Sequence, residues 1–525
     1  MTEKTYPKVG GRSAKIALFL LVIVYIFNFV DRQILSVLAE DIKADLNITD
    51  SDLGFLFGTA FAVFYSIFGI PLGKLADTWS RKNLLSIGLA TWSLMTVLSG
   101  TAKSFGALSV YRIGVGVGES SASPASYSIL SDYFSPKVRS TILSIYSSGV
   151  YLGAGIGLFL GGWIVQLWTN AFPDPNLAPL GLKGWQAAFM LVGLPGIILA
   201  FFTWGIKEPK RGGSEGIESP QESSPFKSTL DEFVGISPLI IFQDKSPLKA
   251  LIINAVSASV ISLICYGLYL ITNDLIQWLA FGVGVYLLSC WIQGLKNRDP
   301  ITFGLMFKTK SLIFAVIGFP FISFVTYSMA AFGPAFYMRN FGISEGEVAT
   351  VLGLITAVAG TVGVILGGYL GDKLRTKYIN GRLYVGFMVI AITIPTTLGL
   401  LFTESLKMSY LYYSIAQIAT PLWVGIAPTT VSDLVLPRMR GVAGAFYILM
   451  VSMLGLALGP YTVGKLSDIF YMNGYNDAVA LKYALAWSLM ALSITLIALI
   501  IACYYLPKEE PTKLERAKAL GESLD

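Results

Sequence analysis

The stretch Asp132-Tyr-Phe-Ser-Pro136-Lys-Val-Arg139 occurs a second time in the chain, as Asp433-Leu-Val-Leu-Pro437-Arg-Met-Arg440. Both copies have the spacing D-x-x-x-P-x-x-R, and they are offset by 301 residues. A second pair of similar stretches, Gly73-Lys-Leu75-Ala-Asp77 and Gly368-Tyr-Leu370-Gly-Asp372, is offset by 295 residues. Each copy lies at the end of a long apolar run. The duplication indicates a chain made of two similar halves.

The composition is that of a membrane protein. The 525 residues are 54% hydrophobic and only 13% charged, whereas a soluble domain has about 25% charged residues. Many uncharged runs reach roughly 18 residues, which is enough to cross the hydrocarbon core of a bilayer. A membrane chain with two similar halves is typical of a secondary transporter, in which the substrate path runs between the halves.

Several other classes of function are excluded or disfavoured. The chain has no His, and its three Cys lie inside apolar runs, so we expect neither a metal site nor a cofactor. The net charge of +6 is spread over short loops, which argues against a nucleic-acid partner. No nucleophile–base pair or nucleotide-binding loop is present, so we expect no enzyme. A non-transporting membrane sensor would carry a further soluble domain.

Fourteen apolar spans are predicted, arranged as six, two and six. The predicted spans are 16–38, 52–74, 83–101, 105–132, 140–167, 185–206, 250–272, 275–294, 311–338, 348–371, 382–402, 408–434, 441–467 and 480–505. They divide the chain into an N-terminal six-helix bundle (1–206), a solvated linker (207–249), an inserted hairpin (250–304), a C-terminal six-helix bundle (305–506) and a tail (507–525). We expect the hairpin to be packing or lipid-facing helices, with one acidic residue, Asp274, at its tip.

Loop charges predict the orientation in the membrane. Basic residues gather before the first span and in alternate loops, as at Arg81 and Lys82, whereas acidic residues such as Asp41 and Asp45 follow the first span. The positive-inside rule therefore puts both termini and the duplicated motifs in the cytoplasm. We expect a multi-pass, monomeric protein of a bacterial inner membrane.

These residues resemble the major facilitator superfamily. The run Gly73-Lys-Leu-Ala-Asp77-Thr-Trp-Ser-Arg81-Lys82 is similar to the loop between helices 2 and 3 of that superfamily, usually written G-x-L-A-D-R-x-G-R-R, with departures at Thr78 and Ser80. The stretch from Asp132 to Arg139 is similar to its loop between helices 4 and 5. The resemblance implies a fold of two six-helix bundles that alternate access to the two sides of the membrane.

Within the superfamily the chain is most similar to the Spinster group of lysolipid and sphingolipid transporters. The similarity rests on Asn28-Phe-Val-Asp-Arg32, Tyr111-Arg-Ile-Gly-Val-Gly-Val-Gly-Glu-Ser120 and Gly184-Trp-Gln-Ala-Ala-Phe189. Gln186 stands where a basic residue is expected, and the hairpin lies outside the usual twelve-helix pattern. The resemblance implies a lipid-like substrate.

Four ionisable residues lie deep in the first half: Asp31, Arg32, Arg112 and Glu119. A charge at the bilayer centre costs about 2.5–3.5 kcal/mol, so each one needs a partner or water. Asp31 and Arg112 are expected at a similar depth, on the order of 10 Å inside the membrane, where they could pair. Glu119 follows Arg112 by two helical turns and therefore shares its face.

The hypothesis drawn from these residues is proton coupling. Glu119, with Asp31 as the next candidate, would bind and release protons, since the chain has no His. Arg112 cannot lose its proton, so it would hold a carboxylate ionised or bind an anionic head group in fork geometry. Protonation of Glu119 would release Arg112 for the substrate. The alternative is a static ion-pair network between helices 1 and 4.

The second half has no matching charges, so an amphipathic ligand fits better than a sugar. The predicted substrate-binding residues are Arg112, Arg32, Tyr25, Phe29, Tyr65, Ser120 and Tyr327. The predicted partners are a lipid-like molecule or organic anion, protons and membrane lipids. Within transport, a drug exporter or a carrier of small organic anions is the alternative.

Two structural roles complete the predictions. Charge clasps that close the cytoplasmic gate in the outward-open state are expected from Asp77, Arg81, Asp132, Arg139, Asp372, Asp433 and Arg440, with Arg139 pairing with Asp132 and Arg440 with Asp433. Gly149, Gly153, Gly157 and Gly161 form a ridge with four-residue spacing, which Gly455 and Gly459 echo. Small residues at this spacing let helices approach closely, and we expect packing at the seam between the halves.

Overall fold

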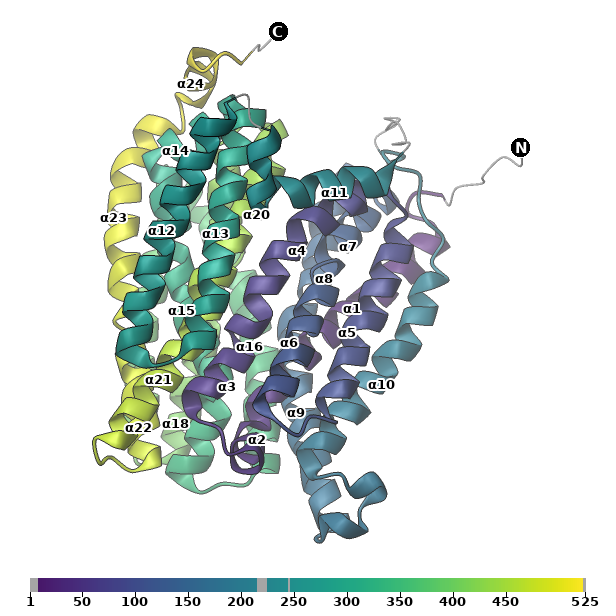
Figure 1. Ribbon diagram of the computed structural model, residues 1–525, viewed down its shortest axis with the longest axis vertical. Helices are drawn as coiled ribbons and strands as arrows, with labels where there is room; N and C mark the ends of the chain where they lie inside the picture. The colour runs from purple at the N-terminus through teal and green to yellow at the C-terminus, as the bar shows by residue number, and fades with distance from the viewer. Residues whose placement is uncertain (1–7, 215–223, 244–245, 523–525) are drawn as a thin grey trace. The chain divides into compact units, whose positions relative to one another are not determined.

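The computed structural model describes residues 8–214, 224–243 and 246–522 (Figure 1). All regular secondary structure in these ranges is helical, which confirms the predicted all-α membrane fold. Residues 1–7, 215–223, 244–245 and 523–525 of the predicted domains lie outside the described ranges.

Each predicted span coincides with one helix or with a consecutive group of helices. They are α1 (Arg12–Val37), α3 and α4 (Asp50–Phe57, Thr59–Thr78), α5 (Arg81–Ser99), α6 and α7 (Phe105–Glu119, Ala122–Tyr133), α8 and α9 (Pro136–Ser147, Gly149–Ala171), α10 (Gly184–Trp204), α12 (Pro247–Thr272), α13 (Leu275–Arg298), α15 (Lys310–Phe341), α16 (Glu345–Arg375), α17 (Gly381–Phe402), α18 and α19 (Leu406–Ala419, Ile426–Asp433), α20 and α21 (Arg440–Met450, Leu458–Met472), and α22 and α23 (Asp477–Ser488, Ala491–Glu509). A π-helical segment, Val451–Ala457, joins α20 to α21.

Eleven helical segments of the described chain are long and apolar enough to cross a membrane. The three predicted spans that fall outside this set are α5, α6 with α7, and α18 with α19. The helix breaks at Ser120 and Ser121 in the second of these and around Thr420–Trp423 in the third, and α5 starts with a polar run at Arg81. The count of fourteen therefore stays a prediction.

The helices form two compact packed units. The first unit contains residues 1–48, 64–233 and 343–357, and the second contains 49–63, 234–342 and 358–525. These units differ from the predicted bundles because α3 packs on α21 and the start of α16 packs on α9. Helices α4 and α16 each contribute to both units.

In the first unit, the glycine ridge of α9 packs against α1. A Cβ at Gly153 would lie 2.4 Å from the Ile26 carbonyl oxygen, and one at Gly157 would lie 2.9 Å from Val30. The prediction that this ridge lies at the seam between the halves is therefore wrong. Two other glycines of α9, Gly155 and Gly162, face α16 instead. The spacing of four residues identified a close contact but not the partner helix.

The predicted solvated linker contains an amphipathic helix, α11 (Pro225–Gly235). Its Phe226 and Phe233 rings contact Trp79 and Phe68 at centroid distances of 5.3 and 5.5 Å. Two aromatic side chains seven residues apart lie on one helical face, so this part of the linker packs on α4 and its C-terminal extension.

In the second unit, the inserted hairpin of α12 and α13 is attached to α21. At its tip, Asp274 accepts hydrogen bonds from the Tyr461 hydroxyl (2.7 Å) and is 3.1 Å from the Lys465 ammonium group. Three shorter helices accompany the spans: α2 (Ala39–Leu46), α14 (Pro300–Lys308) and α24 (Lys513–Ala519).

Candidate functional site

The four predicted intramembrane charges come together between α1 and α6 in the first unit. The residues Asp31 and Glu119 are 0% exposed, and Arg112 is 1% exposed. Only Arg32 keeps some access to solvent, with 15% of its side chain exposed. Because water is excluded from three of these side chains, their charges depend on one another for stabilisation.

Arg32 is the direct partner of Glu119. Its Nε atom donates a hydrogen bond of 2.6 Å to Oε2 of Glu119. The guanidinium carbon also lies 4.8 Å from the centre of the Phe29 ring and 4.9 Å from that of the Tyr65 ring. Two aromatic faces and one carboxylate therefore hold this arginine by a charge-assisted hydrogen bond and cation–π contacts.

Arg112 contacts the neighbouring residue Asp31 through the main chain. Its Nη1 atom donates to the Asp31 carbonyl oxygen at 3.2 Å. The sequence predicted that the Arg112 and Asp31 side chains pair with each other. This hydrogen bond instead joins the Arg112 side chain to the backbone of α1. Arg112 and Glu119 lie on the same α6 helix, as their spacing predicted.

Several polar atoms of this cluster make no hydrogen bond of normal geometry among the described residues, although Thr96 and Trp92 lie near Asp31 and Asn28 lies near Glu119. They are both carboxylate oxygens of Asp31, Oε1 of Glu119 and both polar atoms of the Asn28 amide. Buried polar atoms are almost always paired in folded proteins. Unsatisfied oxygens on two buried carboxylates are where a proton would be accommodated.

The other predicted binding residues are placed as follows. Tyr25 stacks on Tyr146 with ring centroids 4.3 Å apart and meets Phe29 edge-on at 5.3 Å. Ser120 is buried, and its hydroxyl donates to the Val117 carbonyl, which is a helix-terminal role.

Tyr327 belongs to α15 in the second unit. Near it along the same helix, Thr326 helps to line a small cavity of about 20 Å³. The cavity is also lined by Gln417, whose amide donates to the Tyr413 hydroxyl at 2.6 Å. This unit therefore offers neutral hydrogen-bonding groups.

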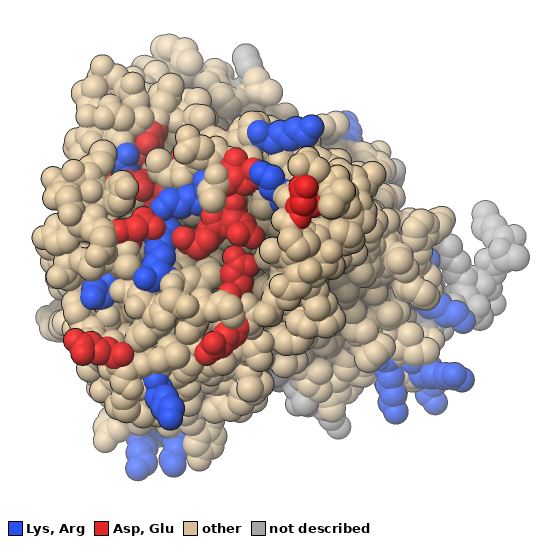
Figure 2. All heavy atoms as spheres, turned by 90° about the horizontal axis from the view of Figure 1, so that it is seen from below, with Lys and Arg blue, Asp and Glu red and all other residues tan. Residues whose placement is uncertain are grey.

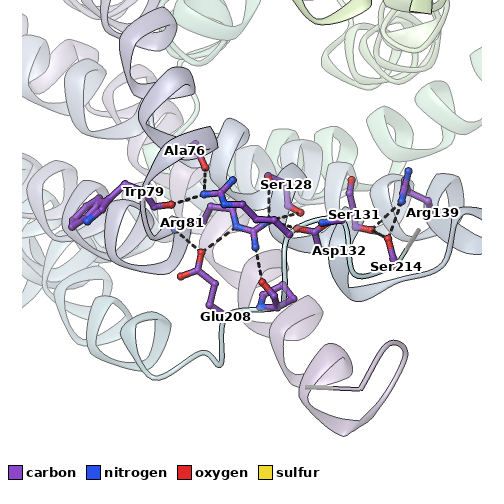
Figure 3. Close-up of polar contacts among 12 residues, drawn as sticks. Ala76, Trp79, Arg81, Ser128, Ser131, Asp132, Arg139, Glu208 and Ser214 are labelled. Atoms are coloured by element: carbon purple, nitrogen blue, oxygen red, sulfur yellow. Dashed lines mark hydrogen bonds and ion pairs between the residues drawn. The ribbon is translucent and has the colours of Figure 1, made fainter. Parts of the chain in front are cut away.

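The first duplicated motif forms a charge cluster centred on Arg81 (Figure 3). Arg81 is 0% exposed and pairs with Asp132, and its Nε lies 3.1 Å from Oε1 of Glu208. Arg139 instead donates to the Ser131 carbonyl and the Ser214 hydroxyl, both at 3.1 Å. The predicted pairing of Arg139 with Asp132 is absent from this structure, because Arg81 occupies that carboxylate.

The second motif repeats this arrangement. Arg382 pairs with Asp433 and also contacts Asp372 at 3.2 Å, while Arg440 donates to the Ser432 carbonyl. The predicted pairing of Arg440 with Asp433 is absent from this structure for the same reason, since Arg382 occupies the carboxylate of Asp433. Arg382 lies 301 residues after Arg81, so the offset of the repeat would have found it.

Asp77, the remaining predicted gate residue, is exposed.

Two further acidic residues that sequence reasoning missed complete the clusters. They are Glu208 beside Arg81 and Glu510, which pairs with Arg375 in the second unit. Each directly precedes a proline near the end of a bundle, in the similar runs Lys207-Glu-Pro209 and Lys508-Glu-Glu-Pro511.

The sequence profile of the Major Facilitator Superfamily matches residues 21–460. The protein belongs to this superfamily. An efflux pump of the superfamily from Mycolicibacterium smegmatis is 25% identical over 459 residues, covering 87% of this chain and 86% of the pump. Protein spinster of Drosophila melanogaster is 26% identical over 467 residues; the match covers 87% of this chain but only 62% of that protein.

Two further relatives of this chain are also Spinster proteins. Human protein spinster homolog 1 is 25% identical over 501 residues, with 91% of this chain and 78% of the human protein covered. A crystal structure of a bacterial homolog to the human lysosomal transporter Spinster, inward-facing and unoccupied, superposes with a TM-score of 0.66 and 26% identity, covering 96% of this chain and 98% of that one. The protein is thus a Spinster-type major facilitator transporter.

Proposed function

We propose that this transporter couples proton movement to the transport of an amphipathic, anionic, lipid-like molecule by alternating access. The observation that carries the proposal is the 2.6 Å bond between Arg32 and a fully buried Glu119 that keeps one unpartnered oxygen. A proton on Glu119 would cancel the charge that holds Arg32. The guanidinium would then be available to an anionic head group, since its planar fork fits phosphate and carboxylate.

Arg112 and Asp31 take supporting parts in this proposal. Arg112 adds a second permanent positive charge beside Asp31, which favours an anion in this region. Asp31, whose two oxygens make no hydrogen bond of normal geometry, is the second candidate for proton binding. The neutral groups that line the cavity of the second unit, including Thr326 and Gln417, suit the uncharged part of an amphipathic substrate, as does Tyr327 on the same helix as Thr326.

The orientation and location belong to the same proposal. The basic loops favour cytoplasmic termini and a bacterial inner membrane. In that orientation the Arg81 and Arg382 clusters lie on the cytoplasmic side. We propose that Asp77 and its counterpart Asp372 contribute to closing the inner gate in another conformation of the cycle.

A small organic anion or a drug is the second candidate for the substrate. The efflux-pump relative favours it, and paired arginines would bind a compact anion as well as a lipid head group.

The test is proton-gradient-driven movement of a fluorescent lysolipid in proteoliposomes. We compare wild type with Glu119→Gln and, as a matched control, with Glu404→Gln, because Glu404 is exposed. We expect the control to behave as wild type and Glu119→Gln to lose the response to the gradient. If wild type moves an organic anion but no lysolipid, the lipid proposal fails. If Glu119→Gln keeps its gradient response, the proton role of Glu119 fails.

A further inference from the structure

The first unit has a groove of about 420 Å³ between α5 and α10. Six of its lining residues repeat the spacing i, i+4, i+7 on their helices: Asn83, Ile87 and Ala90 on α5, and Ile197, Phe201 and Trp204 on α10. Each helix therefore contributes one face of two turns, about 10 Å long. Phe201 and Trp204 are 68% and 59% exposed, so the groove opens outward, where a membrane protein meets lipid.

One end of the groove is polar and aromatic. It is the end at which α5 begins and α10 finishes, and Trp79 and Trp204 both lie there. Tryptophan is enriched where membrane helices reach the lipid headgroups. The Asn83 amide also lines the groove, and its buried Oδ1 atom forms no hydrogen bond within the described part of the chain. An amide can accept a hydrogen bond from a hydroxyl or donate one to a phosphate oxygen.

Two lysines stand at the same end. Lys82 precedes Ser86, another lining residue, by four positions, so both lie on the same side of α5. Lys207 follows Trp204 by three residues and is exposed. The groove thus combines an apolar trough with positive charge and a hydrogen-bonding group at one end.

The acidic residues nearby do not cancel this charge. Both Glu208 and Asp132 pair with Arg81. Arg211 interacts electrostatically with the same two carboxylates. Two guanidinium groups therefore balance these two acids, and Lys82 and Lys207 add positive charge.

The linker helix α11 supports placing this end at the membrane surface. Its Phe226 ring lies 5.3 Å from the ring of Trp79. Phe226 and Leu230, which are one turn apart, are 57% and 63% exposed, and the charged Lys227 and Asp231 follow them directly in the sequence. A helix that exposes large apolar side chains beside charged ones is typical of a helix in the headgroup layer.

The charges at the two ends of the protein also differ. Figure 2 looks onto the end at which α3 begins and shows acidic and basic side chains intermixed there. At the polar end of the groove, three of the five residues in 207–211 are basic. Basic segments beside a membrane attract anionic lipid headgroups.

We propose that the groove between α5 and α10, here called the lipid groove, binds one molecule of an anionic phospholipid of the phosphatidylglycerol type. Its phosphate faces Lys82 and Lys207, a glycerol hydroxyl meets the Asn83 amide, and an acyl chain lies along Ile87 and Ala90. The lipid groove shares no residue with the cluster around Arg32 and Glu119, so this lipid is a bound partner and not the transported substrate.

The experiment is native mass spectrometry of the full-length protein in detergent with added phosphatidylglycerol or phosphatidylcholine of identical acyl chains. We expect wild type to bind the first phosphatidylglycerol at least about tenfold more tightly than phosphatidylcholine, whose headgroup has no net charge to match two lysines. Lys82→Gln combined with Lys207→Gln should lose this preference. Lys103→Gln, which removes an exposed charge beyond the other end of α5, should keep it.

A second variant tests the apolar part of the lipid groove. Ala90→Phe places a ring where the acyl chain lies, so it should weaken binding of the first molecule of both lipids at least about tenfold through overpacking. Val110→Phe adds the same ring type at a position of α6 that is 62% exposed and outside the groove. It should bind both lipids as wild type does.

Equal binding of the two lipids by wild type would overturn the proposal, as would a lysine double variant that binds like Lys103→Gln. Glu119→Gln should keep the preference for phosphatidylglycerol. If Glu119→Gln loses it, the lipid occupies the proposed transport site and the lipid groove is refuted. Because binding is measured without transport, a wild type that moves no lysolipid would refute the proposed substrate and leave this result standing.

Discussion

Arg32 donates a 2.6 Å hydrogen bond to Glu119 across 87 residues of sequence, from the C-terminal part of α1 to the last residue of α6. The pair links the only partly exposed cation of the α1–α6 cluster to a carboxylate without access to solvent. A change in the charge of either residue therefore changes the electrostatic stabilisation of the other.

This relationship predicts the effect of removing the cation. In Arg32→Gln, Glu119 loses the positive charge that favours its ionised form. We expect the rate of transport to fall at least about tenfold and the pH of half-maximal transport to move upward. The measurement is a pH series of proton-driven uptake in proteoliposomes.

The control for this series is Lys103→Gln, which removes an exposed positive charge. It should keep the wild-type pH profile. An Arg32→Gln variant with reduced rate but an unshifted profile would contradict the coupling and favour a static ion pair.

The repeated clusters predict unequal effects on stability. Arg81 is 0% exposed and Arg382 is 17% exposed. Removing one partner from a buried pair costs roughly 3–5 kcal/mol, so Arg81→Gln should lower the thermal midpoint more than Arg382→Gln. Thermal unfolding in detergent measures both, with exposed Arg12→Gln as control. Equal losses would show that burial does not decide the cost here.

The glycine ridge of α9 predicts a steric effect. Gly153→Ala would place a methyl group 2.4 Å from the Ile26 carbonyl oxygen, which forces α1 and α9 apart. We expect destabilisation of roughly 1–3 kcal/mol from overpacking. Gly106→Ala, whose methyl group meets nothing within 4 Å, should be neutral in the same unfolding assay. A neutral Gly153→Ala would mean that these helices are not in close contact.

The hairpin tip predicts a role in bracing α21. Asp274→Asn would keep a hydrogen-bond acceptor for Tyr461 but lose the charge facing Lys465. Hydrogen bonds to charged groups contribute about 1.5–3 kcal/mol, so the thermal midpoint should fall while that of Asp231→Asn, an exposed acid on α11, stays constant. If Asp274→Asn and Asp231→Asn have the same thermal midpoint, Asp274 does not anchor the hairpin to α21.

A pH effect is predicted at Asp41 on α2, whose carboxyl group interacts with that of Glu345 on α16. Burial raises the pKa of Asp41, and the neighbouring Glu40 and Asp45 raise it further. A raised pKa means stability that is present in acid and lost as pH rises through that pKa. Burial and the neighbouring Asp41 also raise the pKa of Glu345 to about 8. The thermal midpoint should therefore fall more steeply as pH rises towards 8 for wild type than for Asp41→Asn. Asp174→Asn should keep the wild-type slope.

The architecture of two similar halves could be predicted from the sequence because it depends on local patterns. Apolar length predicts a spanning helix from the thickness of the bilayer alone, and motifs repeated at offsets of 301 and 295 require no knowledge of contacts. The cost of a charge inside the membrane likewise singled out Asp31, Arg32, Arg112 and Glu119 as a group.

The partners of individual charged residues and of the packed helices could not be predicted from such local patterns. The sequence predicted that Arg139 and Arg440 answer the acids of their own motifs, but Arg81 and Arg382, from other loops, take those positions. The glycine ridge was assigned to the seam, but it packs on α1. The bond of Arg32 to Glu119 was likewise not anticipated.

The physical reason is the same in each case. Hydropathy, helix period and motif spacing depend on residues close together in the chain, so the sequence by itself determined the spans, the repeat and the identity of the buried charges. An ion pair depends on the relative rotation and depth of two helices that are distant in sequence. Tertiary packing alone sets those, and it decided which arginine meets which carboxylate.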